Sequence, residues 1–213
     1  GLVLLATLPP KGPKPMLELH QFRHSAFCEK VRLVLAAKQL PYTVVEVVPG
    51  LGQVQLYRLS GQRQVPVLVD GAEVVADSSA IALHLERLQP EPPLLPADPA
   101  LRAQVLLLED WADTALAAGA RLALVQAAAA DPVLRAGLLP EATPAPLRSL
   151  TAALPADLLR GVGQVIDHGG LEQLRRNLDQ LCSLVQVRSH LVGDALSLAD
   201  LAVMGQLSLL RFP

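Results

Sequence analysis

The sequence has few aromatic residues and no excess of positive charge. Phe, Trp and Tyr make up only 3% of the 213 residues, and the 18 Lys and Arg residues do not outnumber the 20 Asp and Glu residues. A protein that binds nucleic acid usually has a basic surface and aromatic rings on which bases stack. The composition therefore argues against nucleic acid as a partner.

The hydrophobic runs are too short or too interrupted to span a membrane. The N-terminal run of about seven apolar residues ends at Pro9 and Pro10, whereas a spanning helix needs about 20 residues. The longer run TALAAGARLALVQAAAA is interrupted by Gly119, Arg121 and Gln126, a pattern typical of a buried helix. We therefore predict no membrane segment and no membrane partner.

Cysteine is also scarce, since the chain has only Cys28 and Cys182. They are far apart and match neither a disulfide framework nor a metal-binding spacing, which favours a reducing compartment, and we expect a cytoplasmic protein. Among the histidines, His20 and His24 are four residues apart, but one falls at a predicted strand end and the other in a loop. Because they do not share a helical face, we predict no metal site.

Alternating short strands and helices are predicted from Leu17 onward. Hydrophobic periodicity gives the order β-α-β-α-β-β-α within about 75 residues, and Asp70-Gly71 is a strong hairpin signal between the last two strands. This order is typical of an α/β layer in which helices cover a mixed sheet. The predicted strands are 17–22, 42–48 and two within 65–76, and the predicted helices are 26–38, 52–60 and 77–88.

The second half of the chain is predicted to be helical. Five prolines within the eleven residues QPEPPLLPADP indicate a stiff linker. Apolar spacing predicts long helices at 99–129 and 170–187, and Ser197 with Asp200 forms a capping pair at the start of a last helix, which looks truncated at Pro213. The predicted organisation is a tail (1–15), an α/β domain (16–89), the linker (90–98) and an all-helical domain (99–213).

The element order and four short segments together resemble the soluble glutathione transferase family. The segments SAFCEKVRLVL, QVPVLVDG, ADSSAI and GDALSLADLAV occur in the family's order, and the resemblance covers residues 16–213. It implies a thioredoxin-like α/β domain with a mixed four-stranded sheet and three helices, followed by an all-helical bundle domain. It further implies glutathione as co-substrate, a small electrophile as second substrate, a role in detoxification and a homodimer.

The resemblance places part of the glutathione site at Val65-Pro66. This peptide bond would be cis, as in thioredoxin-like folds, and the backbone of Val65 would pair with the cysteinyl part of glutathione as an added strand does. Gln64 and Arg63 are near enough in sequence to contact the ligand, and Arg63 would pair with the glycyl carboxylate. The alternative for Pro66 is that it merely begins a strand.

The second part of the implied site is Asp77-Ser78, at the predicted start of a helix. By resemblance, the hydroxyl and backbone N–H of Ser78 hold the γ-glutamyl carboxylate with help from the helix dipole. Asp77 would face the α-ammonium group of the same ligand. A plain Asp-Ser helix cap is the structural alternative.

Ser25 is the implied activating residue. Lowering the pKa of a thiol by two units from about 8.5 takes about 2.7 kcal/mol, which a hydroxyl donor and a helix N-terminus can supply together. The resemblance implies that Ser25 donates a hydrogen bond to the glutathione sulfur. Its alternative role as N-cap of the helix is compatible with this, because a lone pair can accept while the proton is donated.

Cys28 leaves two interpretations open. A mixed disulfide with glutathione would make it part of the chemistry, whereas its spacing from Val31 and Leu35 would bury it on one face of the helix. Lys30, on the same helix, is predicted to be solvent-exposed.

The predicted function is a glutathione transferase that places the thiolate of glutathione against an apolar electrophile. Segment 108–122, with Trp111, is a candidate wall for the electrophile, although core packing is the alternative for Trp111. Two other functions stay open. One is a glutathione-dependent reductase, dehalogenase or isomerase on the same fold, and the other is a non-catalytic binding module.

Overall fold

The first half of the chain is built on a four-stranded mixed sheet, as predicted. The computed structural model describes residues 17–48, 50–139, 143–153 and 169–211. The predicted tail at 1–15 and the predicted truncation at Pro213 lie outside these residues. The strand order is β2-β1-β3-β4, with β1 parallel to β2 and antiparallel to β3. The strands are β1 (Leu17–Gln21), β2 (Tyr42–Glu46), β3 (Val67–Asp70) and β4 (Glu73–Ala76).

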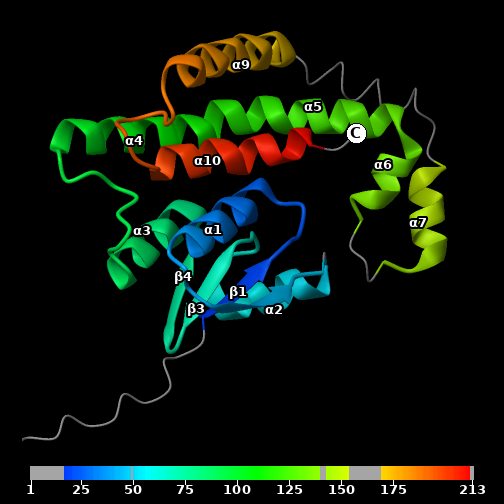
Figure 1. Cartoon of the computed structure of the whole chain (residues 1–213). Helices are drawn as coiled ribbons and strands as arrows, with labels where there is room; N and C mark the ends of the chain where they lie inside the picture. The colour runs from blue at the N-terminus through cyan, green and yellow to red at the C-terminus, as the bar shows by residue number, and fades with distance from the viewer. Residues whose placement is uncertain (1–16, 49, 140–142, 154–168, 212–213) are drawn as a thin grey trace, which may run out of the picture.

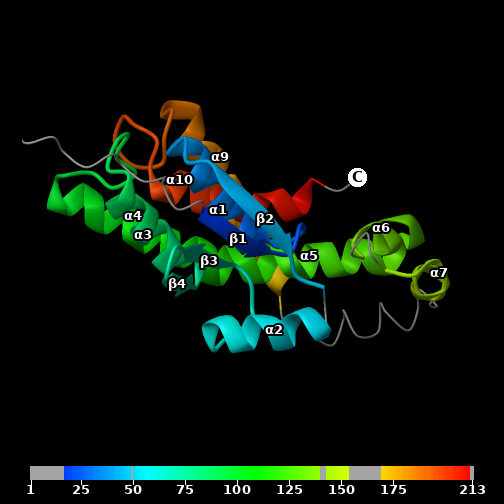
Figure 2. The ribbon, with the colours of Figure 1, turned by 90° about the horizontal axis from the view of Figure 1, so that it is seen from below.

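Three helices cover the two faces of this sheet: α1 (Ala26–Ala37), α2 (Leu51–Ser60) and α3 (Ser78–Leu88). Helices α1 and α3 lie between the sheet and the helical domain, whereas α2 lies on the opposite face (Figure 1, Figure 2). Successive side chains of a strand point to opposite faces. Leu68 therefore enters the core shared with α1 and α3, while its neighbour Val67 packs with Leu56 of α2.

The β3–β4 hairpin turns at Gly71, as the Asp70-Gly71 pair predicted. Gly71 has a φ of +60°, in the left-handed region that most side chains disfavour. Next to the turn, Nε2 of His84 lies 2.9 Å from Oδ2 of Asp70. This contact ties the tip of the hairpin to α3.

The second half of the chain is a helical domain, as predicted (Figure 1). The long helix expected at 99–129 forms one continuous run, but its middle, Ala112–Leu116, is a π-helix. Within the described ranges, no helix is both long and apolar enough to cross a membrane. The elements are α4 (Pro99–Trp111), η1 (Ala112–Leu116), α5 (Ala117–Ala130), α6 (Pro132–Gly137), α7 (Ala145–Ala152), α9 (Gly170–Val187), α10 (Leu198–Leu207) and η2 (Ser208–Leu210).

Helix α10 packs directly on α1 and so joins the two halves of the molecule. It begins with the predicted capping pair, in which the backbone N–H of Ser197 donates to Oδ2 of Asp200 at 2.8 Å. At Gly205, a Cβ would lie 3.0 Å from the backbone oxygen of Ala26 and 3.0 Å from the Cβ of Lys30. A side chain here would force the helices apart, so this close packing requires glycine.

The prediction that Lys30 is solvent-exposed is wrong. Its side chain is completely buried, and its Nζ contacts Glu109 and lies 2.6 Å from Oδ2 of Asp113. Nζ also donates to Oγ of Ser78 at 3.3 Å and to Oγ of Ser79 at 3.1 Å. We call these five residues the Lys30 cluster. The ammonium group is tolerated in the interior because two carboxylates and two hydroxyls replace its hydration shell.

Replacing Lys30 tests how far the fold depends on this cluster. We expect Lys30→Met to lower the free energy of unfolding by about 3–5 kcal/mol, because it leaves two carboxylates buried without their cation. Urea denaturation followed by circular dichroism measures the change. Arg102→Met on the exposed side of α4 is the control and should stay within about 0.5 kcal/mol of the wild type. Equal stability of the two variants would show that the cluster does not hold the domains together.

Candidate functional site

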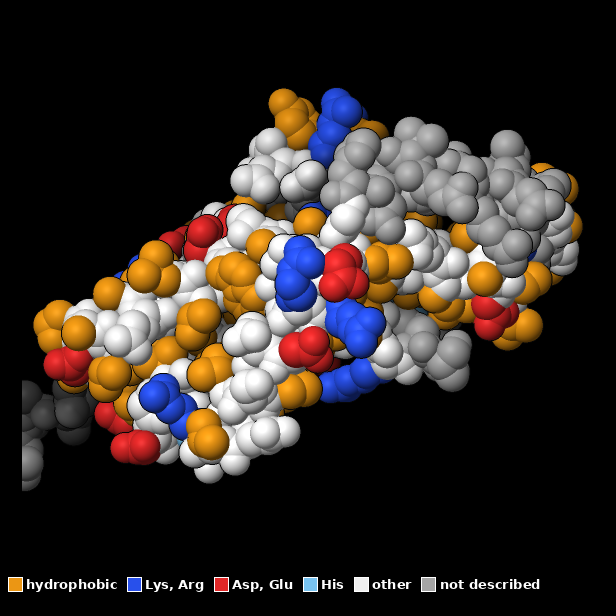
Figure 3. All heavy atoms as spheres, turned by 90° about the horizontal axis from the view of Figure 1, so that it is seen from above, with side chains coloured by type: hydrophobic (Ala, Val, Ile, Leu, Met, Phe, Trp, Pro, Cys, Tyr) orange, Lys and Arg blue, Asp and Glu red, His pale blue; other side chains and the backbone are white. Residues whose placement is uncertain are grey.

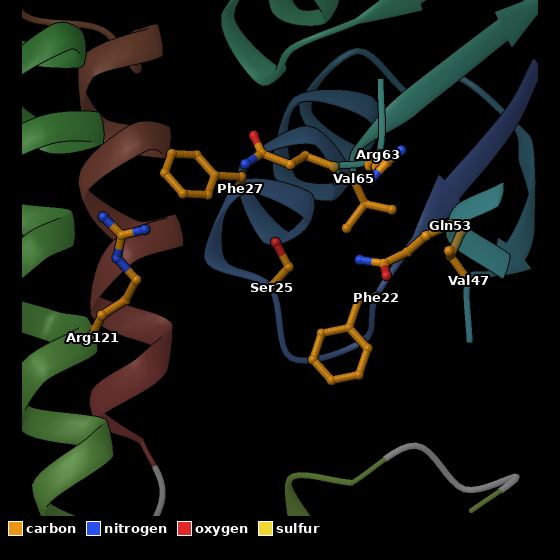
Figure 4. Close-up of a pocket in the computed structure, with 9 residues that line it drawn as sticks. Phe22, Ser25, Phe27, Val47, Gln53, Arg63, Val65 and Arg121 are labelled. Carbon is orange, nitrogen blue, oxygen red and sulfur yellow. The ribbon is translucent and has the colours of Figure 1, made fainter. Parts of the chain in front are cut away.

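Two adjoining cavities lie beside the start of α1, and Figure 4 shows the residues that line the first of them. The first has a volume of about 360 Å³ and the second a volume of about 150 Å³. Phe27, Gln64 and Val65 line both, so the two cavities form neighbouring parts of one site. The first is also lined by Phe22, Ser25, Val47, Gln53, Arg63 and Arg121, and the second by Gln62, Pro66, Asp77 and Ser78.

The structure brings together every residue for which the sequence predicted a glutathione contact. Their common location is compatible with one ligand that contacts both the Val65-Pro66 and the Asp77-Ser78 stretch, and glutathione binding itself stays a prediction. The Val65-Pro66 peptide bond is cis, as expected. The residues that meet here are Ser25, Arg63, Gln64, Val65, Pro66, Asp77 and Ser78.

Ser25 is both the N-cap of α1 and a lining residue of the first cavity. Its extended backbone (φ −80°, ψ 123°) lets Oγ accept a hydrogen bond from the backbone N–H of Cys28 at 3.3 Å. A hydroxyl that accepts through a lone pair can still donate its proton. The hydroxyl also lies at the positive end of the helix dipole, which favours a negatively charged group in the cavity.

The start of α3 forms a wall of the second cavity. Asp77 is the N-cap, and its Oδ1 accepts from the backbone N–H of Ser79 at 2.9 Å. Its φ of +79° lies in a region that is strained for aspartate, and such strain concentrates at functional sites. Ser78 is buried, and its hydroxyl lies between Nζ of Lys30 and Oδ2 of Asp113 at 3.3 and 3.4 Å. The Asp-Ser cap is therefore present, and the cavity opens beside it.

Cys28 is completely buried on the inner face of α1, with Val31 and Leu35. Burial raises the pKa of the Cys28 thiol above its ordinary value, and the neighbouring polar groups of Ser25 and the Phe22 backbone only partly oppose this effect. The thiolate is the reactive form of cysteine. The structure therefore favours the packing role of Cys28 over a mixed disulfide.

The described residues give the first cavity a positive lining, because they include two arginines and no Asp or Glu. The guanidinium of Arg63 lies 5.5 Å from the centre of the Tyr57 ring, and that of Arg121 lies 6.0 Å from the centre of the Phe27 ring. Both distances allow a cation–π contact that orients the side chain. His24, next to Ser25 in sequence, adds no further charge at neutral pH, because burial lowers its pKa.

The part of the chain that the structure describes contains no cluster of His, Cys, Asp and Glu that could hold a metal ion. The polar groups around the two cavities are helix termini, hydroxyls, amides, arginines and the Asp77 carboxylate.

Sequence reasoning missed several lining residues. Two of the chain's three phenylalanines, Phe22 and Phe27, flank Ser25, and this grouping was visible in the sequence. Arg121 lies within the predicted wall segment 108–122, but no local signal distinguished it from its neighbours, because it reaches the cavity from α5 in the other domain. Trp111, the candidate for the electrophile wall, is partly buried against the main core and lines neither cavity.

Comparison with known proteins decides the family. Residues 19–93 match the family model for the glutathione S-transferase N-terminal domain. FtsZ-localized protein A of Caulobacter vibrioides is 30% identical over 198 residues, covering 91% of this chain and 77% of that protein. A zeta-class glutathione S-transferase of Euphorbia esula is 39% identical over 88 residues, covering 40% of this chain and 39% of that enzyme. The chain belongs to the soluble glutathione transferase family.

Structural comparison agrees with the family assignment. A solved structure of glutathione S-transferase I bound with lactoylglutathione has a TM-score of 0.68 and 22% identity, covering 93% of this chain and 85% of that one. At this identity the likeness shows the fold alone, a thioredoxin-like domain followed by a helical domain. The zeta-class match spans less than half of that enzyme, so its activity does not transfer directly to this family member.

The two cysteines should differ sharply in reactivity. With a disulfide reagent at pH 8, we expect the exposed Cys182 of the native protein to react quickly and Cys28 only after unfolding in urea. Absorbance of the released chromophore counts one thiol per native chain and two per unfolded chain. Cys28→Ser should leave the native count unchanged, whereas Cys182→Ser should abolish it. Rapid reaction of Cys28 in the native protein would revive its role in thiol exchange.

Proposed function

We propose that this protein binds glutathione across the two cavities and activates its thiolate for attack on a small electrophile. The observation that carries the proposal is the convergence of three features on one site. They are the Ser25 hydroxyl at the start of α1, the cis bond of Val65-Pro66 and the N-terminus of α3 at Ser78.

The chemistry of the lining matches an extended tripeptide. The second cavity, beside Asp77 and Ser78, offers a carboxylate for the ligand's α-ammonium group and a helix N-terminus for the γ-glutamyl carboxylate. Val65 lines both cavities and supplies backbone groups for the cysteinyl residue in the middle. Arg63, in the first cavity, supplies a guanidinium for the glycyl carboxylate.

In this arrangement the sulfur of glutathione lies at the Ser25 hydroxyl. The hydroxyl donates to the sulfur and the α1 dipole favours the anion, so the thiol proton passes to solvent at neutral pH. The thiolate then forms a bond to the electrophilic carbon, and the leaving group departs with its bonding electrons. No general base is required from the protein, because the reactive anion already exists in the ground state.

Two other candidate functions differ in their support. A reductase that uses Cys28 is disfavoured because the thiol is buried and its pKa is raised. A binding module without turnover has one specific observation in its favour, the 30% identity to FtsZ-localized protein A over 91% of this chain. The name of that relative refers to its location with FtsZ and not to a reaction. Such a module would retain the glutathione-shaped site but would not accelerate transfer.

We extend the proposal to the protein's setting by analogy with its family. A homodimer, a cytoplasmic location and a role in detoxification are the expected context for a soluble transferase. Lys, Arg, Asp and Glu side chains are interspersed on the face seen in Figure 3.

Ser25 provides the test of thiolate activation. We expect Ser25→Ala to lower kcat/KM for chlorodinitrobenzene by about 10- to 100-fold, because one or two pKa units of thiolate stabilisation are lost. The ultraviolet absorbance of bound thiolate, followed against pH, should show the pKa of bound glutathione rising toward that of the free thiol. Ser25→Thr keeps a hydroxyl and the helix cap and should retain most of the activity. Full activity in Ser25→Ala would refute activation by this residue.

Arg63 provides the test of glutathione orientation. We expect Arg63→Gln to weaken glutathione binding about tenfold in calorimetric titration, because a charge-assisted pair with the glycyl carboxylate is lost. Glutathione with a C-terminal amide in place of that carboxylate is the matched ligand, and its affinity should be the same for both proteins. If the substitution weakens both ligands equally, Arg63 does not recognise the carboxylate.

A further inference from the structure

The first cavity contains a cation that the proposed glutathione arrangement leaves unused. Arg121 comes from α5, and among the residues that the structure describes it is the only one from the helical domain that lines either cavity. In Figure 4 it lies on the opposite side of the Ser25 hydroxyl from Arg63. The two ends of glutathione are assigned to Arg63 and to the start of α3, so Arg121 faces whatever approaches the sulfur from the helical domain.

Arg121 is oriented by its neighbours but not neutralised by them. Its Nε donates to the backbone oxygen of Ala117 at 3.2 Å, and its guanidinium lies 6.0 Å from the centre of the Phe27 ring. Among the described residues it has no ion pair with Asp or Glu. Its two terminal nitrogens are therefore available to a ligand, and their planar arrangement fits a carboxylate with two parallel hydrogen bonds.

The rest of the lining favours a ligand with an apolar body. Phe22, Phe27, Val47 and Val65 supply rings and branched side chains around the same cavity, and none of its described lining residues is acidic. The guanidinium of Arg121 would thus attract an anionic ligand, and no described carboxylate in the cavity would repel it. The carbon skeleton of the ligand would pack against the apolar side chains of the lining. Segment 108–122 was expected to supply an apolar wall. Arg121, the described residue of this segment that lines the cavity, is instead a cation.

We infer that Arg121 binds the second substrate and that this substrate is an electrophile carrying a carboxylate on an apolar or aromatic body. The inference rests on the proposed function only in that glutathione occupies the side of the site with Arg63. For an aryl chloride of this kind, a carbon–sulfur bond forms and the carbon–chlorine bond breaks. Chloride leaves with the electron pair, and the thiol proton has already gone to solvent.

A matched pair of probes tests this inference: a chlorodinitrobenzoate with chlorine para to the carboxylate, and its methyl ester. The two have the same reacting carbon and nearly the same shape, and they differ in charge. Binding of each probe is measured first by equilibrium dialysis without glutathione, and turnover is then measured with glutathione. We expect the wild type to prefer the acid about tenfold in binding, after correction for the partition of each probe into an inert protein.

Substitution of Arg121 should remove this preference. In Arg121→Gln, the acid should lose about tenfold in affinity and in kcat/KM, while the ester changes less than twofold. Arg121→Lys keeps the charge without the paired geometry and should retain part of the preference. Arg102→Gln, with the same charge change on the exposed side of α4, is the control and should behave as the wild type. Because the Arg121 side chain is itself exposed, the fold should tolerate these changes, and a melting temperature checks this.

The outcomes separate this inference from the proposed function. If neither probe is turned over but the acid still binds better through Arg121, the transferase proposal fails and the carboxylate-binding role of Arg121 stands. If glutathione conjugation proceeds and the wild type shows no preference for the acid, the inference fails and the transferase proposal stands. Equal loss of acid and ester in Arg121→Gln also overturns it, since Arg121 would then act by shape or through glutathione itself.

Discussion

The buried ammonium group of Lys30 is the constraint on which the arrangement of the two domains depends. Its partners come from α3 at Ser78 and Ser79, from α4 at Glu109 and from η1 at Asp113, while the lysine itself belongs to α1. An unpaired charge in the interior costs several kcal/mol, so these elements have to stay in register for the charge to be compensated. The cluster therefore fixes the helical domain against the thioredoxin-like domain.

Both cavities of the candidate site depend on this packing of the helical domain against the thioredoxin-like domain. Ser78, which lines the second cavity, places its hydroxyl within the Lys30 cluster, and Arg121 reaches the first cavity from the helix that continues out of η1. The close contact of Gly205 with α1 acts in the same region, because it lets α10 approach the helix that Ser25 caps. The residues that pack the two domains together, namely the Lys30 cluster and Gly205, therefore also position the residues that line the two cavities.

Much of the thioredoxin-like domain could be predicted, because its signals are local. Alternation along short strands and the Asp70-Gly71 turn act within a few residues, and the structure has each of them where expected. The same holds in the helical domain for the capping pair Ser197-Asp200. Lys30 shows the limit of such reasoning. A lysine between a glutamate and a valine gives no sign that two carboxylates from another domain will surround it.

The sequence by itself determined the element order and the helix starts at Ser25 and Asp77. It also indicated most of the residues that meet at the proposed glutathione site. The element order and the helix starts follow from backbone capping and side-chain periodicity, which are properties of neighbouring residues. The site residues were instead implied by the resemblance to the glutathione transferase family. Only the tertiary structure decided that Cys28 is buried, that Trp111 packs into the core and that Arg121 faces the cavity. Burial and charge pairing depend on which elements pack together, and that depends on contacts between residues far apart in the chain.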